Sequence, residues 1–93
     1  MSALVLLQNG SNSLVVKKSA ERDLRALSKA DLRRITGRIH GLAHDPRPPG
    51  HEKLSGQDHY RVRQGDYRVV YAIDDDRLLI TIVKIGHRRE VYR

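Results

Sequence analysis

The chain has 93 residues, of which 39% are hydrophobic and 31% charged, and its formal net charge is +7. This length and composition predict one soluble globular domain and exclude a disordered chain or a two-domain protein. Cysteine is absent, which excludes disulfides and thiolate chemistry, and no apolar run is long enough to span a membrane. We therefore expect a cytoplasmic protein, and the excess of positive charge favours a polyanionic partner.

The N-terminal segment divides into an extension and the start of the domain. Residues 1–12 form the predicted extension, outside the core of a single domain that covers residues 13–93. The turn-rich run Gln8–Ser13 separates two apolar pieces. A first strand is predicted at Leu14–Val16, where three apolar residues stand together.

Two helices are predicted after this strand. The first is short, with Ser19 as its expected N-cap, and its apolar positions are Ala20, Leu24 and Leu27. Ser28 and Asp31 resemble a capping box that starts a longer second helix. The apolar stripe of this helix is Leu32, Ile35, Ile39 and Leu42. The proline-rich run Asp45–Gly50 ends it, because proline cannot donate the backbone hydrogen bond that a helix needs.

A β-hairpin is predicted over residues 60–73. Apolar and polar residues alternate there and the alternation breaks at Gly65-Asp66, which is typical of a two-residue type II′ turn. If Gln64 pairs with Tyr67, three arginines share one face of the hairpin. Arg63 then lies opposite Arg68, and Arg61 lies opposite Val70. Like charges directly opposite each other destabilise a sheet. This face therefore favours an anionic partner.

A last strand follows a second turn. Asp74–Asp76 marks the reversal, and these adjacent carboxylates are interpreted as a solvated turn rather than a metal site. The apolar run Leu78–Val83 predicts a strand buried on both faces. The predicted fold class is α+β, a small antiparallel sheet of about four strands with two N-terminal helices packed on one face.

The candidate functional residues include no convincing metal site. His40 and His44 are one helical turn apart, but no third ligand accompanies them, so no metal is predicted. The remaining polar residues suit RNA cleavage, because RNA supplies its own nucleophile and arginines match phosphate oxygens. They are Lys53, Arg61, Arg63, Arg68, His87, Arg88, Glu90 and Tyr92. From spacing alone, a nucleic-acid site and a merely solvated sheet face are equal alternatives, and catalysis is less favoured than binding.

Three segments together resemble the RelE/ParE toxin superfamily. They are Lys53-Leu54-x-Gly56, the run from Tyr60 to Tyr71, and Gly86-His87-Arg88-x-x-Val91-Tyr92. The resemblance covers about residues 13–93 and implies a small antiparallel sheet with two N-terminal helices. Members of the RelE branch are bacterial toxins that cleave messenger RNA in the ribosomal A site. The resemblance therefore implies the same activity, with a cognate antitoxin, the ribosome and mRNA as partners and no small-molecule cofactor.

The resemblance also implies roles for individual residues. The family's two basic residues on one strand are matched by Arg61 and Arg63, and its later arginines and tyrosine by Arg68, Arg88 and Tyr92. The predicted catalytic residues are Arg63, Arg68, His87, Arg88 and Tyr92. The predicted RNA-binding residues are Lys53, Arg61 and Arg89.

One departure from the family concerns proton transfer. Some members have a lysine, proposed as the general base, where this chain has arginine, and others use a glutamate base with a C-terminal histidine. Arginine stays protonated in proteins, so Arg63 cannot accept a proton. Histidine is the side chain that ordinarily titrates near neutral pH. We therefore assign proton transfer to His87, with Glu90 and Tyr92 as rivals.

Two other functions remain open at this point. The ParE branch of the superfamily shares the fold but inhibits DNA gyrase and lacks the RNA-cutting residues. The other possibility is a module that binds RNA or an antitoxin without turnover. Arg61, Arg63, Arg68 and Arg88 together with Tyr92 favour the RelE branch over the ParE branch.

Overall fold

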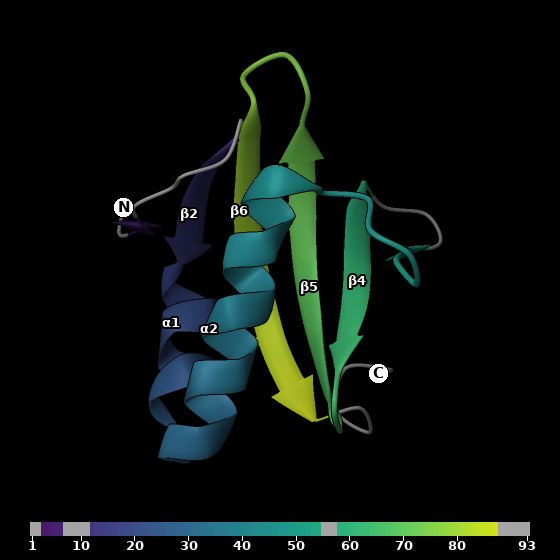
Figure 1. Ribbon diagram of the computed structural model, residues 1–93. Helices are drawn as coiled ribbons and strands as arrows, with labels where there is room; N and C mark the ends of the chain where they lie inside the picture. The colour runs from purple at the N-terminus through teal and green to yellow at the C-terminus, as the bar shows by residue number, and fades with distance from the viewer. Residues whose placement is uncertain (1–2, 7–11, 55–57, 88–93) are drawn as a thin grey trace.

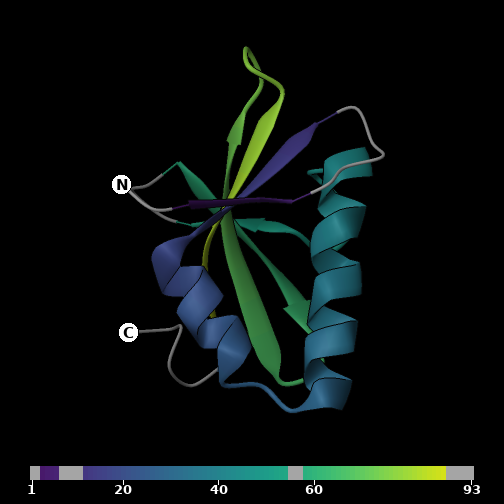
Figure 2. The same ribbon diagram turned by 90° about the vertical axis from the view of Figure 1, so that its left-hand side faces the viewer.

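The computed structural model describes residues 3–6, 12–54 and 58–87. Within these residues the chain forms two helices and a six-stranded sheet, and both helices lie against one face of the sheet (Figures 1 and 2). The elements are β1 (Ala3–Leu6), β2 (Ser13–Lys17), α1 (Lys18–Arg25), α2 (Lys29–His44), β3 (Glu52–Lys53), β4 (His59–Gln64), β5 (Tyr67–Asp74) and β6 (Leu79–His87). The predicted α+β class is confirmed. No helix in the described part of the chain is long and apolar enough to cross a membrane.

The sheet is mixed and wider than predicted. Its strands lie in the order β1-β2-β6-β5-β4-β3, and only β2 and β6 run parallel among these neighbours. Parallel strands need a long crossover, and here both helices and the β4–β5 hairpin stand between β2 and β6 in the chain. The short strands β1 and β3 extend the two edges beyond the roughly four strands expected, and β1 belongs to the segment assigned to the extension.

The predicted register of the β4–β5 hairpin is confirmed. Gln64 pairs with Tyr67, Arg63 lies opposite Arg68, and Arg61 lies opposite Val70. Gly65 has a φ of +62°, as the first position of a type II′ turn requires. The alternation of side chains along a strand then puts the arginines and Val70 on one face, and Val62, Val69 and Tyr71 on the face that meets the helices.

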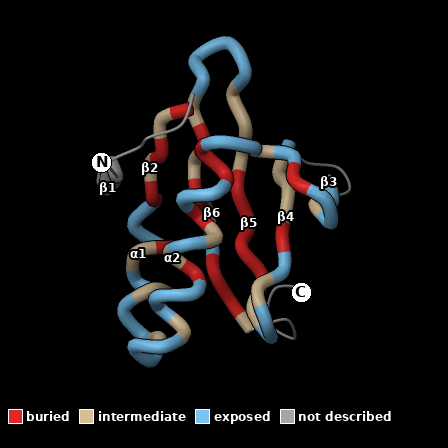
Figure 3. The backbone as a smooth tube through the Cα atoms, viewed as in Figure 1, coloured by how far each residue is buried: buried red, intermediate tan, exposed pale blue. Residues whose placement is uncertain are grey.

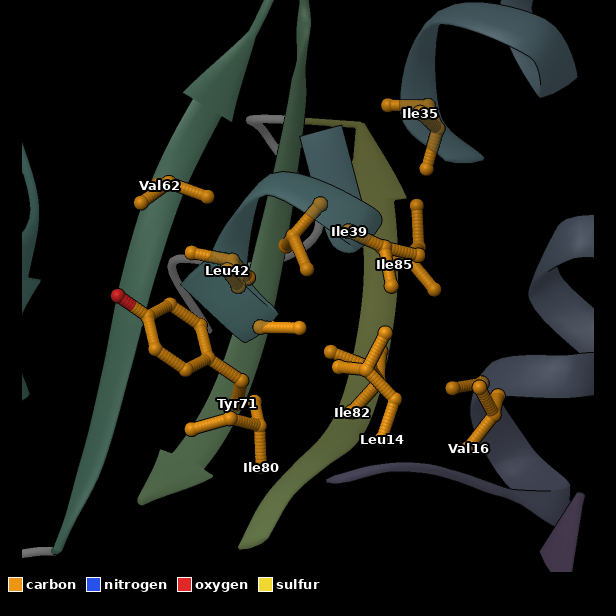
Figure 4. Close-up of a cluster of buried hydrophobic side chains, with 13 residues drawn as sticks. Leu14, Val16, Ile35, Ile39, Leu42, Val62, Tyr71, Ile80, Ile82 and Ile85 are labelled. Atoms are coloured by element: carbon orange, nitrogen blue, oxygen red, sulfur yellow. The ribbon is translucent and has the colours of Figure 1, made fainter. Parts of the chain in front are cut away.

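The hydrophobic core lies between α2 and the central strands (Figures 3 and 4). Ser28 caps α2 as predicted, since its Oγ accepts a hydrogen bond from the backbone N–H of Asp31 at 3.2 Å. Ile35, Ile39 and Leu42 are buried, but Leu32 is 37% exposed. The predicted stripe is therefore buried at three of its four positions, and Leu32 in the first turn of α2 lies outside the buried core cluster. Each fully buried aliphatic side chain contributes roughly 1.5–3 kcal/mol.

Helix α1 takes the place of a strand beside part of β6. Strand β2 pairs with β6 only as far as Ile82. Beyond it, the Ser19 hydroxyl donates to the carbonyl of Val83 at 2.9 Å, and Asp23 Oδ2 accepts from the N–H of Ile85 at 3.0 Å. The prediction of Ser19 as N-cap was wrong, since Lys17 occupies that position and Ser19 bonds to the sheet.

Strand β6 differs from the predicted doubly buried strand. Ile80 and Ile82 are buried, whereas Leu78 is 53% exposed in the turn, with a φ of 52°. The helices cover only one face of the sheet, so the side chains on its other face stay partly accessible (Figure 3). An irregularity in the β5–β6 register, between Val70/Lys84 and Tyr71/Ile82, lets Ile82 and Ile85 both face the core.

Candidate functional site

Three arginines lie on the face of the sheet opposite the helices. Arg61 and Arg63 come from β4 and Arg68 from β5, and each alternates with a residue that is buried in the core. Arg63 is exposed, the Arg61 side chain is 15% exposed, and Arg68 is only 4% exposed. The hairpin register therefore brings three of the predicted site residues together, as the sequence indicated.

A carboxylate that the sequence did not predict joins this cluster. Glu52 of β3 lies opposite Arg61, and its Oε1 accepts a hydrogen bond from Arg61 Nε at 2.8 Å. The pKa of Glu52 is lowered from its ordinary value, first by this hydrogen bond and also by the charges of Arg68 and Arg63. Glu52 is therefore ionised at neutral pH. We call Glu52, Arg61, Arg63 and Arg68 the arginine cluster.

A hollow of about 360 Å³ marks the place where a ligand of the arginine cluster would bind. It is lined by Gly50, Glu52, Arg63 and Arg68. Arg63 and Arg68 stand opposite each other across the strands, and like charges in such a pair destabilise a sheet. The described lining of the hollow thus includes two guanidinium groups, and guanidinium groups match the oxygens of a phosphate. Among the described residues that line the hollow, Glu52 is the group that could accept a proton, which an arginine cannot do.

His87 lies in a different hollow. It ends β6 opposite Tyr67, and the two rings meet edge to face with centroids 6.0 Å apart. Their hollow has a volume of about 420 Å³ and is bounded by the first turns of α2 and the β4–β5 turn. Tyr67 and Arg68 are neighbours in β5, so their side chains point to opposite faces. The structure thus does not bring His87 together with the arginine cluster.

The remaining predicted residues lie apart from the hollow or outside the described ranges. Lys53 is exposed on the edge strand β3, next to Glu52, and does not line the hollow. The residues that fall outside the described part of the chain are Arg88, Arg89, Glu90 and Tyr92. Within the described ranges, no three His, Asp or Glu side chains gather into a group that could hold a metal ion.

Glu52 was missed because its own position carries little local signal. It follows the proline-rich loop and belongs to a strand of two residues, too short for a periodic pattern. The available signal was its place directly before Lys53-Leu54, a segment already singled out. Recognising its role requires the pairing of β3 with β4, which places it opposite Arg61.

Comparisons with known proteins agree with this architecture. Residues 14–92 match the family model described as "ParE toxin of type II toxin-antitoxin system, parDE". The chain is 32% identical over 79 residues to Toxin RelG of Mycobacterium tuberculosis, covering 81% of this chain and 88% of that protein. It is similar to a chain of the archaeal RelE–RelB complex from Pyrococcus horikoshii, with 32% identity, a TM-score of 0.76, and coverage of 84% and 96%. It also resembles a chain of the toxin–antitoxin complex RelBE2 from Mycobacterium tuberculosis, with 25% identity, a TM-score of 0.77, and coverage of 87% and 95%.

Proposed function

We propose that this chain, which belongs to the ParE toxin family of type II toxin–antitoxin systems, is a metal-free endoribonuclease that cleaves mRNA on the ribosome. Its relatives include proteins named as RelE toxins, among them one from Mycobacterium tuberculosis that is 33% identical over 84 residues. The observation that carries the proposal is the arginine cluster around a hollow on the open face of the sheet. A protein that acts on translating ribosomes would work in the cytoplasm, and we propose this location for it.

The proposed reaction uses the RNA's own nucleophile. The 2′-oxygen forms a bond to the adjacent phosphorus, its proton passes to an acceptor, and the bond from phosphorus to the 5′-oxygen breaks. The leaving 5′-oxygen takes up a proton, which gives a 2′,3′-cyclic phosphate and a 5′-hydroxyl. Negative charge grows on the phosphate in the transition state, and preorganised guanidinium groups stabilise it there.

The residues of the arginine cluster divide these tasks. We propose that Arg61 and Arg63 bind the phosphates, because one is held by Glu52 and the other is exposed on the same strand. Arg68 is the most buried of the three and is best placed to stabilise developing charge, since electrostatic effects are stronger away from water. Glu52 is the proposed acceptor of the 2′-hydroxyl proton, because its carboxylate lines the hollow beside Arg63 and Arg68.

The other predicted residues keep proposed roles that follow from the resemblance. His87 stays the residue to which the sequence assigns proton transfer, but it lies on the other face of the sheet from the arginine cluster, so Glu52 is its rival for the role of base. Arg88 and Tyr92 stay predicted catalytic residues, and Lys53 and Arg89 stay predicted RNA-binding residues. A matched pair of variants, Glu52→Gln and His87→Gln, decides which of the two acts as the base.

A cognate antitoxin is the proposed protein partner. Solved complexes of similar proteins contain RelE with RelB, as in Pyrococcus horikoshii. The arginine cluster would attract an acidic segment, and such a segment would block the hollow where RNA binds. We expect the two chains to co-purify when expressed together. A chain that purifies alone and leaves growth unaffected on induction would count heavily against a toxin.

Reconstituted translation with mapping of mRNA ends tests the enzymatic proposal. We expect the wild-type protein to cut mRNA within the ribosomal A site and Arg63→Ala to cut far less. Arg77→Ala is the control, because Arg77 is also exposed and lies in the turn after β5, away from the hollow. Intact mRNA after incubation with active ribosomes and folded wild-type protein would reject the nuclease.

The family model favours a second candidate function, inhibition of DNA gyrase, because the matching model describes ParE. A supercoiling assay with purified gyrase separates the two candidates. The nuclease proposal expects no inhibition at concentrations that abolish translation. Inhibition of supercoiling without any RNA cut would replace it with a ParE-type function.

A further inference from the structure

The loop between α2 and β3, residues 45–51, crosses the end of the sheet to reach the far side of β4 (Figure 1). Its backbone is fixed by several hydrogen bonds. The Tyr71 hydroxyl donates to the carbonyl of Pro46 at 2.7 Å, and the N–H of Arg47 donates to Asp45 Oδ1 at 3.1 Å. The N–H of His51 donates to the carbonyl of Pro48 at 3.0 Å. The loop therefore has a defined shape despite its exposure.

Arg47 links this loop to the distant turn between β5 and β6. Its guanidinium donates to both carboxylate oxygens of Asp75, at 3.2 and 3.0 Å. The same guanidinium lies over the ring of Tyr60, 5.5 Å from its centroid. The side chains of Arg47 and Asp75 are 42% and 68% exposed, and ion pairs as exposed as this one contribute little to folding stability. A two-pronged contact of a planar guanidinium does, however, fix orientation.

The loop that Arg47 holds leads directly into the arginine cluster. Near its end stands Gly50, whose φ of +88° allows the turn into β3, and Glu52 follows two residues later. Gly50 and Glu52 both line the hollow. The Arg47 guanidinium stacks over the ring of Tyr60. Tyr60 directly precedes Arg61, which is hydrogen-bonded to Glu52. Arg47 thus contacts the strand that bears Arg61 and holds the loop that delivers Glu52.

We propose that Arg47 is a positioning residue, which through Asp75 and Tyr60 holds the 45–51 loop where Glu52 pairs with Arg61 in the hollow. Arg47 does not line the hollow and acts only through the loop. The inference rests on the proposed nuclease for its effect on cleavage. The predicted effect of Arg47 on the position and pKa of Glu52 depends only on the geometry and not on the proposed nuclease.

The first measurement follows the ionisation of Glu52 by NMR titration of its side-chain carboxyl. In the wild type its pKa lies below the ordinary value because of Arg61, Arg68 and Arg63. Removing the Arg47 side chain would release the loop and weaken the hydrogen bond from Arg61, which is the largest cause of the lowered pKa. We expect Arg47→Ala to raise the pKa of Glu52 toward the ordinary carboxyl range, and Asp75→Asn to do the same. Arg77→Ala removes an exposed arginine that pairs with Asp74 at the start of the β5–β6 turn. This control should leave the pKa of Glu52 unchanged.

The second measurement follows cleavage by the same variants. A misplaced catalytic group lowers kcat, so we expect a ten- to hundredfold loss of kcat in Arg47→Ala with KM nearly unchanged. Asp75→Asn should give a similar loss, and the double variant no more than either single change, since both act through one contact. Arg47→Lys should not restore the rate, because an ammonium lacks the planar fork.

The two proposals fail in different ways. A folded Arg47→Ala or Asp75→Asn protein that keeps the wild-type titration of Glu52 and the wild-type kcat overturns the positioning role. Wild-type protein that never cuts RNA overturns the nuclease, while the titration of Glu52 still decides the role of Arg47. Asp75→Asn keeps side-chain size on an exposed turn, so it decides the question even where Arg47→Ala does not fold.

Discussion

Replacing Glu52 by Gln tests the proposed chemistry most directly. The amide oxygen of Gln can still accept the hydrogen bond from Arg61 Nε, now 2.8 Å from the carboxylate, so the geometry should persist. The change removes one negative charge from the arginine cluster, whose four residues then carry a formal charge of +3 instead of +2. RNA should therefore bind several-fold more tightly. Cleavage with saturating substrate should fall by about a hundredfold or more, the usual contribution of a general base.

Single-turnover cleavage and filter binding of a short RNA measure these two effects separately. Opposite changes in binding and rate would exclude unfolding as the cause, because an unfolded protein loses both. The pH dependence adds a further criterion. The pKa of Glu52 is lowered, so its carboxylate is ionised above the ordinary carboxyl range and the rate should stay flat from about pH 5.5 upward. Wild-type cleavage by Glu52→Gln, or a wild-type rate that rises near pH 6.5 as for a histidine base, would refute the assignment.

Three further predictions address the rest of the molecule. His87→Gln should slow cleavage by roughly a hundredfold in single-turnover assays if His87 transfers a proton, and an unchanged rate would leave it a structural residue. Tyr71→Phe should lower the free energy of unfolding in urea by about 1–3 kcal/mol, because the Pro46 carbonyl loses its donor. Burial raises the pKa of Tyr71 to about 12, so the wild type should also lose stability as the pH rises above 10 toward 12, and Tyr71→Phe should lose less. Ile39→Ala should cost about 2–5 kcal/mol in the same urea experiment, since Ile39 is 1% exposed in the core, and a loss below 1 kcal/mol would contradict that packing.

Local patterns in the sequence determined the elements that carry the site. The two-residue turn at Gly65-Asp66 and the alternation around it predicted both the hairpin and its register, because a strand's side chains change face at every residue. That register alone placed Arg61, Arg63 and Arg68 on one face. The cap at Ser28 was likewise readable, since a hydroxyl and the amide three residues later meet wherever a helix starts.

Only the tertiary structure decided which of these residues share a hollow. The predicted strand stops at Val83, whereas β6 continues to His87, and the pairing of His87 opposite Tyr67 turns it toward the helices and away from Arg68. Glu52 joins the cluster because the 45–51 loop carries β3 back to the edge of β4. Both outcomes depend on pairing between segments far apart in the chain. A periodic pattern fixes which side of its own strand a residue occupies, but the register between strands and the path of a loop fix its neighbours.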